Sequence, residues 1–476
     1  MAVASNGAFV VTSIPAGRVV DRTGHAASWY KRSEATVHSS EHHSAAFSAV
    51  GTGLALGALG SSSRSRRAQR RAQPASMDEK RFPVLSKRRQ AVGRFPKLPE
   101  SVHPGVLSGQ AVVDLLNHAK KEGFAIPAVN CVSSSSINAC IEAARKMDAP
   151  VIIQFSSGGS QFYAGKGLDN TNFHAAIAGA VSGAYHVRAI AEQYGVPVIL
   201  HTDHCAKNLL PWFDGLVEAN ERYFERHGEP LFSSHMLDLS EEPLEENIEI
   251  CVKYMERLAK VKCGLEMELG LTGGEEDGVN NEDANPEDLY STPEEIYRVY
   301  DALSKVPDAN FTIAAAFGNV HGVYQPGNVR LEPEILGRAQ QYIKEKTDGK
   351  DGEKPVNFVF HGGSGSDLKD IRQAVEYGVI KMNIDTDTQW SYWNGINGFE
   401  KKYHDYLQSQ IGNPDGSEKP NKKYYDPRAC MRAAEVSTVE RLQKSFEDLK
   451  CVSVLGLGPP DQPQNVLGPR RGGLPA

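Results

Sequence analysis

The feature that most constrains this chain is a repeated alternation of short β-rich runs with longer segments of helical period. Eight runs are predicted as strands: Ala125–Cys131, Pro150–Ser156, Pro197–Thr202, Phe232–Leu237, Leu265–Leu269, Phe311–Phe317, Asn357–His361 and Val379–Ile384. Segments between them have the apolar spacing of helices: Ser136–Lys146, Gly183–Tyr194, Leu244–Leu258, Pro293–Leu303, Glu332–Lys346 and Ser366–Tyr377. Strand–helix units of this number close a (β/α)₈ TIM barrel, the α/β fold that we predict. The alternative is an open doubly wound sheet, but the glycine-rich first turn typical of that fold is absent.

Polar side chains gather at the carboxyl ends of these predicted strands, where TIM barrels carry their chemistry. The residues are Asn130, Ser156, Asp203, His204, Asp238, Glu266, Glu268, Asn319, His321, His361, Asn383 and Asp385. A barrel needs none of them in order to fold. The clustering therefore predicts an active site at this rim.

Three of these residues are histidines that follow three different strands: His204, His321 and His361. Three neutral imidazoles with an open fourth position are typical of a catalytic zinc-type site. His201 and His235 remain rival ligands, because strand periodicity alone does not fix the direction of their rings. Glu268 and Asp238 could each supply a carboxylate to a second metal position or orient an imidazole.

Two turns next to the seventh and eighth strands favour phosphate binding. The run His361–Ser366 (HGGSGS), which includes Gly362, Gly363 and Ser364, exposes backbone N–H groups and precedes a helix. Asn383, Asp385 and Thr386 form a second polar turn beside it. Loops after strands seven and eight are the usual phosphate site of such barrels.

The loop after the fifth strand carries a Gly-Gly pair followed by the acidic triplet Glu275–Asp277. A loop of this kind could bring a carboxylate over bound substrate as a general base. A G-x-S-x-G elbow and a G-x-x-x-x-G-K-[ST] loop are both absent from the sequence, which argues against a serine esterase and a P-loop NTPase.

Six motifs together resemble the class II, metal-dependent fructose-bisphosphate aldolases, in their longer, dimeric branch. They are His201–Cys205 (HTDHC), Leu265–Asp277 (LEMELGLTGGEED), Gly318–Tyr324 (GNVHGVY), His361–Ser366, Lys381–Trp390 (KMNIDTDTQW) and Asn421–Arg428 (NKKYYDPR). The resemblance covers about residues 101–455. It implies reversible aldol cleavage of fructose 1,6-bisphosphate to dihydroxyacetone phosphate and glyceraldehyde 3-phosphate, with a metal ion stabilising the enediolate.

The resemblance also implies roles for particular residues. His204, His321 and His361 would hold the divalent ion, usually zinc, with Glu268 as an alternative ligand and Asp238 at an accessory metal position. Glu276 would be the base that removes the carbon proton, and Asp203 the acid–base group at the substrate oxygen. The substrate-binding residues would be Asn130, Ser156, Gly322, Gly362, Gly363, Ser364, Asn383, Asp385, Thr386 and, from the partner subunit of a homodimer, Arg428. An activating monovalent cation such as K⁺ or Na⁺ would bind Val320, Gly322, Gly362 and Ser364.

Two alternatives remain open at this point. A tagatose-bisphosphate aldolase would use the same chemistry on an epimeric sugar, and no residue distinguishes the two substrates. A catalytically silent barrel that serves as an interaction module would need a lost ligand or base, and none is lost.

Composition sets further limits. The chain has 52 Lys and Arg against 59 Asp and Glu, and residues 77–476 carry a net charge of about −13, which is a poor match to nucleic acid. An apolar run long enough to span a membrane is not found. The seven cysteines are irregularly spaced, which argues against a disulfide scaffold.

The two ends differ in composition from the body. Residues 1–76 contain nine Lys and Arg but three Asp and Glu, and they are rich in Ala and Ser. This composition predicts a targeting presequence and linker, mostly disordered, over residues 1–95, and a plastid location, with a mitochondrion or the cytoplasm as alternatives. We expect the catalytic domain over residues 96–455 and a flexible Pro/Gly-rich tail over 456–476.

Overall fold

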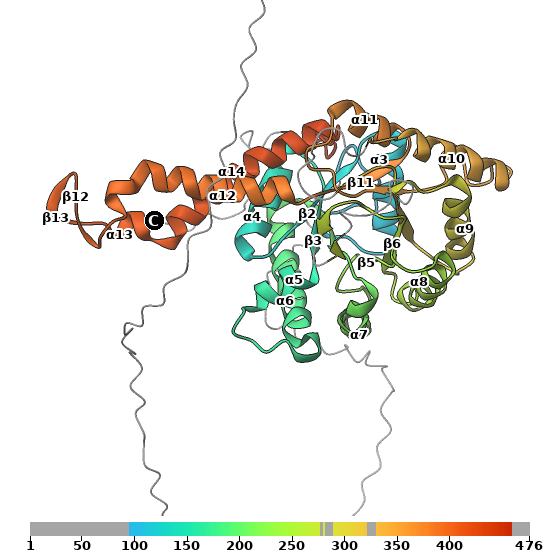
Figure 1. Ribbon diagram of the computed structural model, residues 1–476, viewed down its shortest axis with the longest axis horizontal. Coiled ribbons are helices and arrows are strands. Elements are labelled where there is room, and N and C mark those ends of the chain that lie inside the picture. Colours follow the sequence, from blue (N-terminus) through green and yellow to red (C-terminus); the bar gives the residue numbers. More distant parts are fainter. Residues whose placement is uncertain (1–94, 277–278, 281–288, 321–329, 459–476) are drawn as a thin grey trace, which may run out of the picture. The chain divides into compact units, whose positions relative to one another are not determined.

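The structure is a computed structural model, and it describes residues 95–276, 279–280, 289–320 and 330–458 (Figure 1). At its centre lie eight parallel strands: β2 Ile126–Asn130, β3 Val151–Phe155, β4 Pro197–Thr202, β5 Ser234–Leu237, β6 Gly264–Leu269, β9 Phe311–Ala315, β10 Phe358–Phe360 and β11 Val379–Ile384. Their side chains are almost all buried, which is typical of parallel strands covered on both faces. Each predicted strand is present, with bounds that differ by at most two residues.

The eight strands close into a barrel. They pair in the order β2-β3-β4-β5-β6-β9-β10-β11, and β11 returns to pair with β2 through Lys381–Ile384 and Ile126–Val129. A two-residue strand, β1 (Gly105–Val106), adds to the start of β4. This closure confirms the predicted (β/α)₈ fold, and the open doubly wound sheet is wrong because an open sheet would leave β2 and β11 unpaired with each other.

Helices connect the strands: α3 Gln110–Glu122, α4 Ser134–Met147, α5 Ser157–Ala164, α6 His174–Tyr194, α7 Leu210–His227, α8 Leu244–Ala259, α9 Pro293–Ser304, α10 Glu334–Lys346 and α11 Leu368–Glu376. Their starts follow local sequence rules. Ser133 caps α4 and Thr292 caps α9, each in a reciprocal capping box, and Pro293 occupies the first turn of α9.

Helix α3 covers the amino-terminal end of the barrel. Val112 and Leu116 of α3 line a small cavity together with Ser234, Gly264 and Phe311, which are the first residues of β5, β6 and β9. The opposite, carboxyl end of the barrel is therefore the end left for chemistry.

The last part of the described chain forms a segment that we call the arm, residues 386–448. It contains α12 Thr386–Tyr403, the hairpin of β12 Ile411–Asn413 and β13 Gly416–Pro420, α13 Lys422–Tyr425 and α14 Pro427–Asp448. Figure 1 shows α13 and the hairpin lying beyond the helices that surround the barrel. Helix α14 packs on α4, where Arg432 makes two hydrogen bonds, of 2.6 and 2.9 Å, to the carboxylate of Glu142.

The arm exposes several large apolar side chains. Trp390 and Trp393 of α12 are 64% and 53% exposed, and Ile411 of the hairpin is 60% exposed. Among the described helices, none is both long and apolar enough to cross a membrane.

Candidate metal centre and active site

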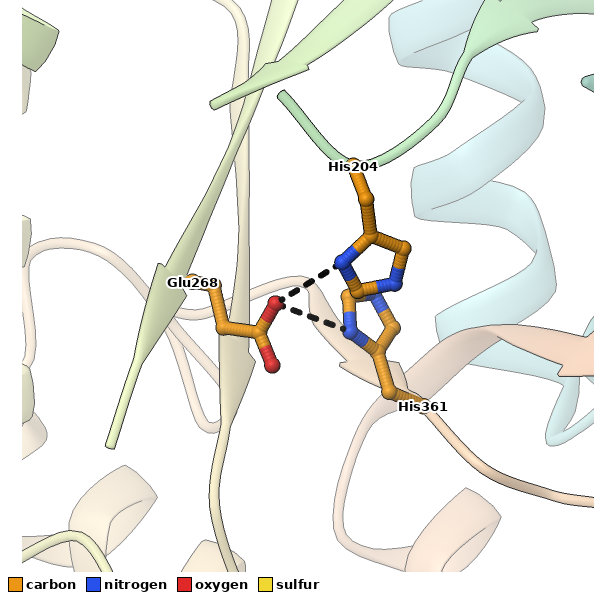
Figure 2. A group of neighbouring side chains, drawn as sticks. All are labelled: His204, Glu268 and His361. Atoms are coloured by element: carbon orange, nitrogen blue, oxygen red, sulfur yellow. Dashed lines mark ion pairs between the residues drawn. The ribbon is translucent and has the colours of Figure 1, made fainter. Parts of the chain in front are cut away.

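Three side chains converge at the carboxyl end of the barrel to form the candidate metal centre (Figure 2). His204 follows β4, Glu268 lies on β6 and His361 follows β10. Glu268 Oε2 lies 3.4 Å from His204 Nδ1 and 3.3 Å from His361 Nδ1. The centroids of the two imidazole rings are 4.8 Å apart. All three residues are at most 5% exposed.

The donor set fits a divalent metal of the zinc type. Glu268 Oε1 accepts a hydrogen bond from Thr272 Oγ1 at 2.7 Å, whereas the buried Oε2 accepts none from the described residues. A buried carboxylate oxygen without a hydrogen-bond donor, placed between two imidazoles, is unfavourable unless a cation shares the site. Imidazole nitrogen and carboxylate oxygen are both zinc ligands.

Asp238, which follows β5, orients His204. Its Oδ2 lies 2.9 Å from His204 Nδ1, and its Oδ1 accepts from Ser240 Oγ at 2.7 Å. Burial opposes ionisation of Asp238, but its bonds to His204 and Ser240 hold the pKa of the carboxyl well below its usual range. The carboxylate therefore keeps the proton of His204 on Nδ1, so that the ring's lone pair lies on Nε2.

Glu266, two residues before Glu268 on β6, contacts the other imidazole. Its Oε1 lies 3.0 Å from His361 Nε2, and both of its oxygens accept from Lys381 Nζ, at 2.7 and 2.8 Å. Burial lowers the pKa of His361, but Glu268 and Glu266 outweigh it and raise that pKa to about 9. In the absence of a metal, the two carboxylates thus favour a positive charge at this imidazole.

Neither rival histidine belongs to the group of His204, Glu268 and His361. His235 is a core residue, because its Nδ1 bonds to Thr202 Oγ1 at 2.7 Å and its Nε2 accepts from Asn220 Nδ2 at 2.8 Å. Burial lowers the pKa of His235 to about 3, so the ring is neutral. His201 bonds to Ser234 Oγ at 2.8 Å through Nδ1, and its Nε2 lies 3.7 Å from Glu266.

Asp203 lies at the centre of a second polar group beside the histidines. Asn130 Nδ2 and Gln154 Nε2 donate to its Oδ2 at 2.9 and 2.7 Å, and Asn383 Nδ2 lies 3.3 Å from its Oδ1. These residues come from four different strands or strand ends, β2, β3, β4 and β11. Three amide donors hold a fully buried carboxylate in one orientation, next to the metal centre.

The two predicted phosphate turns lie against each other. Gly363 N donates to Asn383 O at 3.2 Å, and Ser364 Oγ lies 3.4 Å from the backbone nitrogen of Asp387 in the first turn of α12. A Cβ at Gly363 would lie 2.6 Å from Met382 Cγ and 3.0 Å from Asn383 O, so glycine allows the two turns to approach this closely. Asp385 and Thr386 begin α12, so the positive end of that helix faces this turn. The arrangement suits an anion.

Several of the predicted site residues can be placed only in part. His321 and Gly322 lie outside the described residues, and of Glu276 only the backbone is described, in strand β7 (Glu275–Glu276). Val320 forms a bridge to Gly273, so the loops that lead to His321 and Glu276 run side by side. Ser156 accepts from Gly159 N and caps α5.

Arg428 lies in the arm, apart from the metal centre. Its side chain is 89% exposed and forms an ion pair with Asp426 at 2.6 Å. The described residues of one chain therefore leave this guanidinium on the surface of the arm.

Sequence reasoning missed Gln154 and Lys381 as site residues. Both carried a signal, because each is a polar side chain inside an otherwise apolar strand, VIIQF and VIKMNI. Period 2 places Gln154 on the same face as Ser156, and Lys381 on the same face as Asn383.

Comparisons with known proteins agree with this geometry. The family model "Fructose-bisphosphate aldolase class-II" matches residues 110–453. "Fructose-bisphosphate aldolase" of Campylobacter jejuni is 58% identical over 352 residues, which is 74% of this chain and 98% of that protein. "Fructose-bisphosphate aldolase class 2" of Escherichia coli K12 is 56% identical over 75% of this chain and 99% of its own length. The crystal structure of a Campylobacter jejuni fructose-bisphosphate aldolase superposes with a TM-score of 0.67 over 74% of this chain and 97% of that one, at 56% identity.

Proposed function

The chain belongs to the class II fructose-bisphosphate aldolase family, whose reaction is the reversible aldol cleavage of fructose 1,6-bisphosphate, and we propose that its divalent metal is zinc. His204, His321 and His361 would hold the ion, with Glu268 as an alternative ligand. The observation that supports this proposal most strongly is the buried Glu268 Oε2 between two imidazoles. When bound, zinc would supply a Lewis acid to the ketose carbonyl and to the enediolate.

Two carboxylates would move the protons. Asp203 is fixed by Asn130, Gln154 and Asn383, so its position relative to bound substrate is set before the substrate arrives. We assign it the proton transfer at the substrate oxygen during carbon–carbon cleavage. Glu276 follows the Gly273-Gly274 pair, and we assign it the carbon proton of dihydroxyacetone phosphate.

The glycine turn after β10 and the start of α12 would bind one phosphate. Gly362, Gly363 and Ser364 would offer backbone and hydroxyl donors, and Asp385 and Thr386 would close the other side. Ser156 and Asn130 would contact the rest of the sugar. A monovalent cation such as K⁺ or Na⁺ would bind Val320, Gly322, Gly362 and Ser364 and assist in phosphate binding.

We propose that the arm joins two chains in a homodimer. Its exposed Trp390, Trp393 and Ile411 would become buried, and Arg428 would reach the second phosphate of the partner's substrate. Replacing both tryptophans by serine should convert a dimer to a monomer in light scattering. A wild-type protein that runs as a monomer at micromolar concentration would contradict this assembly.

The amino-terminal segment supports a plastid location. Residues 1–76 lie outside the described part of the chain, and the proposal rests on their composition, which is rich in Ala, Ser and Arg and poor in acidic residues. The carbon metabolism of that organelle, or glycolysis and gluconeogenesis, would use the enzyme.

A cleavage assay distinguishes the proposed activity from the alternatives. Purified enzyme should cleave fructose 1,6-bisphosphate much faster than tagatose 1,6-bisphosphate, and borohydride added with substrate should trap no covalent adduct, because no imine forms. A preference for the tagatose epimer would make the chain a tagatose-bisphosphate aldolase. No cleavage of either sugar by the zinc-loaded protein would favour a silent barrel.

A further inference from the structure

The ion pair of Glu266 and Lys381 lies in the barrel interior, directly behind the candidate metal centre, and none of the roles assigned above uses it. Glu266 is 2% exposed and Lys381 is 3% exposed. Lys381 Nζ donates to both carboxylate oxygens, at 2.7 and 2.8 Å, which fixes the plane of the carboxylate. The same carboxylate reaches His361 Nε2 at 3.0 Å.

The contact between Glu266 and His361 selects one of the two imidazole nitrogens. A carboxylate only accepts hydrogen bonds, so the proton of a neutral His361 ring lies on Nε2 and the lone pair lies on Nδ1. Nδ1 is the nitrogen that faces Glu268 Oε2, at 3.3 Å. His204 also has a carboxylate partner, but there Asp238 lies against Nδ1, the nitrogen that also faces Glu268 Oε2, so its lone pair lies on Nε2.

We propose that Glu266 is a positioning residue of the metal centre. Glu266 holds the His361 ring in the tautomer that presents Nδ1 to the ion, and Lys381 compensates the buried charge of Glu266. This inference rests on the proposed function in one respect, namely that His361 binds the metal. Buried acceptors of this kind orient metal-bound histidines and raise metal affinity.

An alternative use of the same residues is less consistent with their contacts. His201, Asp203 and Glu266 have ligand atoms close enough together to hold a second metal ion. Lys381 already places a positive charge on both oxygens of Glu266, and a second cation there would be repelled. The ion pair of Glu266 and Lys381 is therefore consistent with a single metal ion, at His204, Glu268 and His361.

The experiment compares two double variants that differ only in an acceptor at residue 266. Glu266→Gln/Lys381→Met and Glu266→Leu/Lys381→Met both remove the two charges together, so neither leaves an unpaired buried charge. The glutamine carbonyl oxygen can accept from His361 Nε2, and the leucine side chain cannot. Glu266→Met/Lys381→Met serves as a second acceptor-free variant in case the leucine protein does not fold.

The measurement is zinc affinity of the purified apo-enzymes by competition with a chromophoric chelator, together with the visible spectrum of the cobalt-loaded proteins. We expect the acceptor-free variants to bind zinc about 10- to 100-fold more weakly than wild type and to show an altered cobalt spectrum. The glutamine variant should stay within about threefold of wild type, because its acceptor is retained. Circular dichroism establishes that each protein is folded.

Equal zinc affinity and equal cobalt spectra in the glutamine and the acceptor-free variants would overturn the inference. If the wild-type protein itself bound no zinc, the proposed function would fail, and that result is distinguishable because it does not depend on residue 266.

Discussion

At the scale of single residues, the site is a set of buried groups that fix one another. Asp203 accepts from three amide side chains, and Asp238 and Glu266 each contact one imidazole. Such pre-organisation places reactive groups before substrate binds, which is a major source of catalytic rate.

The roles of Asp203 and Glu276 can be separated by two conservative variants. Glu276→Gln should slow both exchange of the dihydroxyacetone-phosphate proton with solvent and cleavage. Asp203→Asn should slow cleavage while exchange survives better, because exchange needs no chemistry at the aldehyde. Each kcat should fall on the order of 10²-fold or more, the usual effect of losing a general acid or base.

For each variant, two rates are measured: deuterium exchange of the dihydroxyacetone-phosphate proton and cleavage of fructose 1,6-bisphosphate. The zinc content of each protein is the control. Loss of exchange in Asp203→Asn as complete as in Glu276→Gln, with zinc retained, would show that this division of roles is wrong.

Much of the site could be predicted from the sequence because its residues stand at strand ends. Asp203 and His204 follow β4 directly, and His361 follows β10. Gln154 and Lys381 lie inside strands, where periodicity gives their face but not their partners, which come from other strands. The contact of Asp238 with His204 joins the ends of two strands, so the sequence left open whether Asp238 binds a metal or orients an imidazole.

At the scale of elements, the sequence predicted those strands and helices whose apolar residues follow a clear pattern. The barrel strands are continuous apolar runs bounded by turn residues, and all eight were found. Helix α7 was missed because Pro211 and Gly215 resemble helix breakers. Pro211 lies in the first turn, where proline is tolerated, and Gly215 lies where an added Cβ would be 2.3 Å from Ile177 Cδ1, so glycine allows α7 to pack closely on that side chain. Helices α12 and α14 were missed because their apolar residues do not follow one face.

Packing of α12 on α14 depends on a close approach at Gly395. A Cβ at this position would lie 2.5 Å from Ala433 O. Gly395→Ala should therefore lower the free energy of unfolding by on the order of 2 kcal/mol, because the two backbones must separate. Gly398 lies on the same helix with no atom within 4 Å of an added Cβ, so Gly398→Ala is the matched control and should be neutral or stabilising by about 0.5–1 kcal/mol. Urea unfolding of both variants tests this, and equal stabilities would contradict the packing argument.

The contact between α14 and α4 should make stability depend on pH. The hydrogen bonds from Arg432 outweigh burial and lower the pKa of Glu142 to about 2, from an ordinary value of 4.5. Because the folded-state pKa is depressed, this stabilisation is fully present above about pH 4.5 and is lost as the pH falls toward 2. Glu142→Gln should be less stable than wild type by about 1–2 kcal/mol at pH 7, after allowance for solvent screening. Unfolding of both proteins at pH 7, 4.5 and 3 should show the difference shrinking, and a difference independent of pH would exclude the mechanism.

At the scale of the whole molecule, the described chain is a catalytic barrel with an arm. The described residues extend to Gly458, where the backbone nitrogens of Leu457 and Gly458 donate to Asp148 at 2.9 and 3.0 Å. Residues 1–94 and 459–476 lie outside the described part, so the targeting and tail predictions stay predictions.

Removal of residues 1–76 should leave activity and thermal stability nearly unchanged, because the family match begins at residue 110 and does not include this segment. The same segment fused to a fluorescent protein should enter a plastid. The checks are kcat, melting temperature and microscopy. A truncated enzyme that unfolds, or a fusion that stays in the cytosol, would contradict the presequence hypothesis.

We propose that His204, Glu268 and His361 belong to a zinc-dependent aldolase centre. The most direct test is the rate of fructose 1,6-bisphosphate cleavage by the purified enzyme after exhaustive chelation, with zinc content measured in the same samples. Cleavage should disappear as zinc is removed and return when one equivalent per chain is added back. Full activity in a protein shown to contain no divalent metal would contradict it.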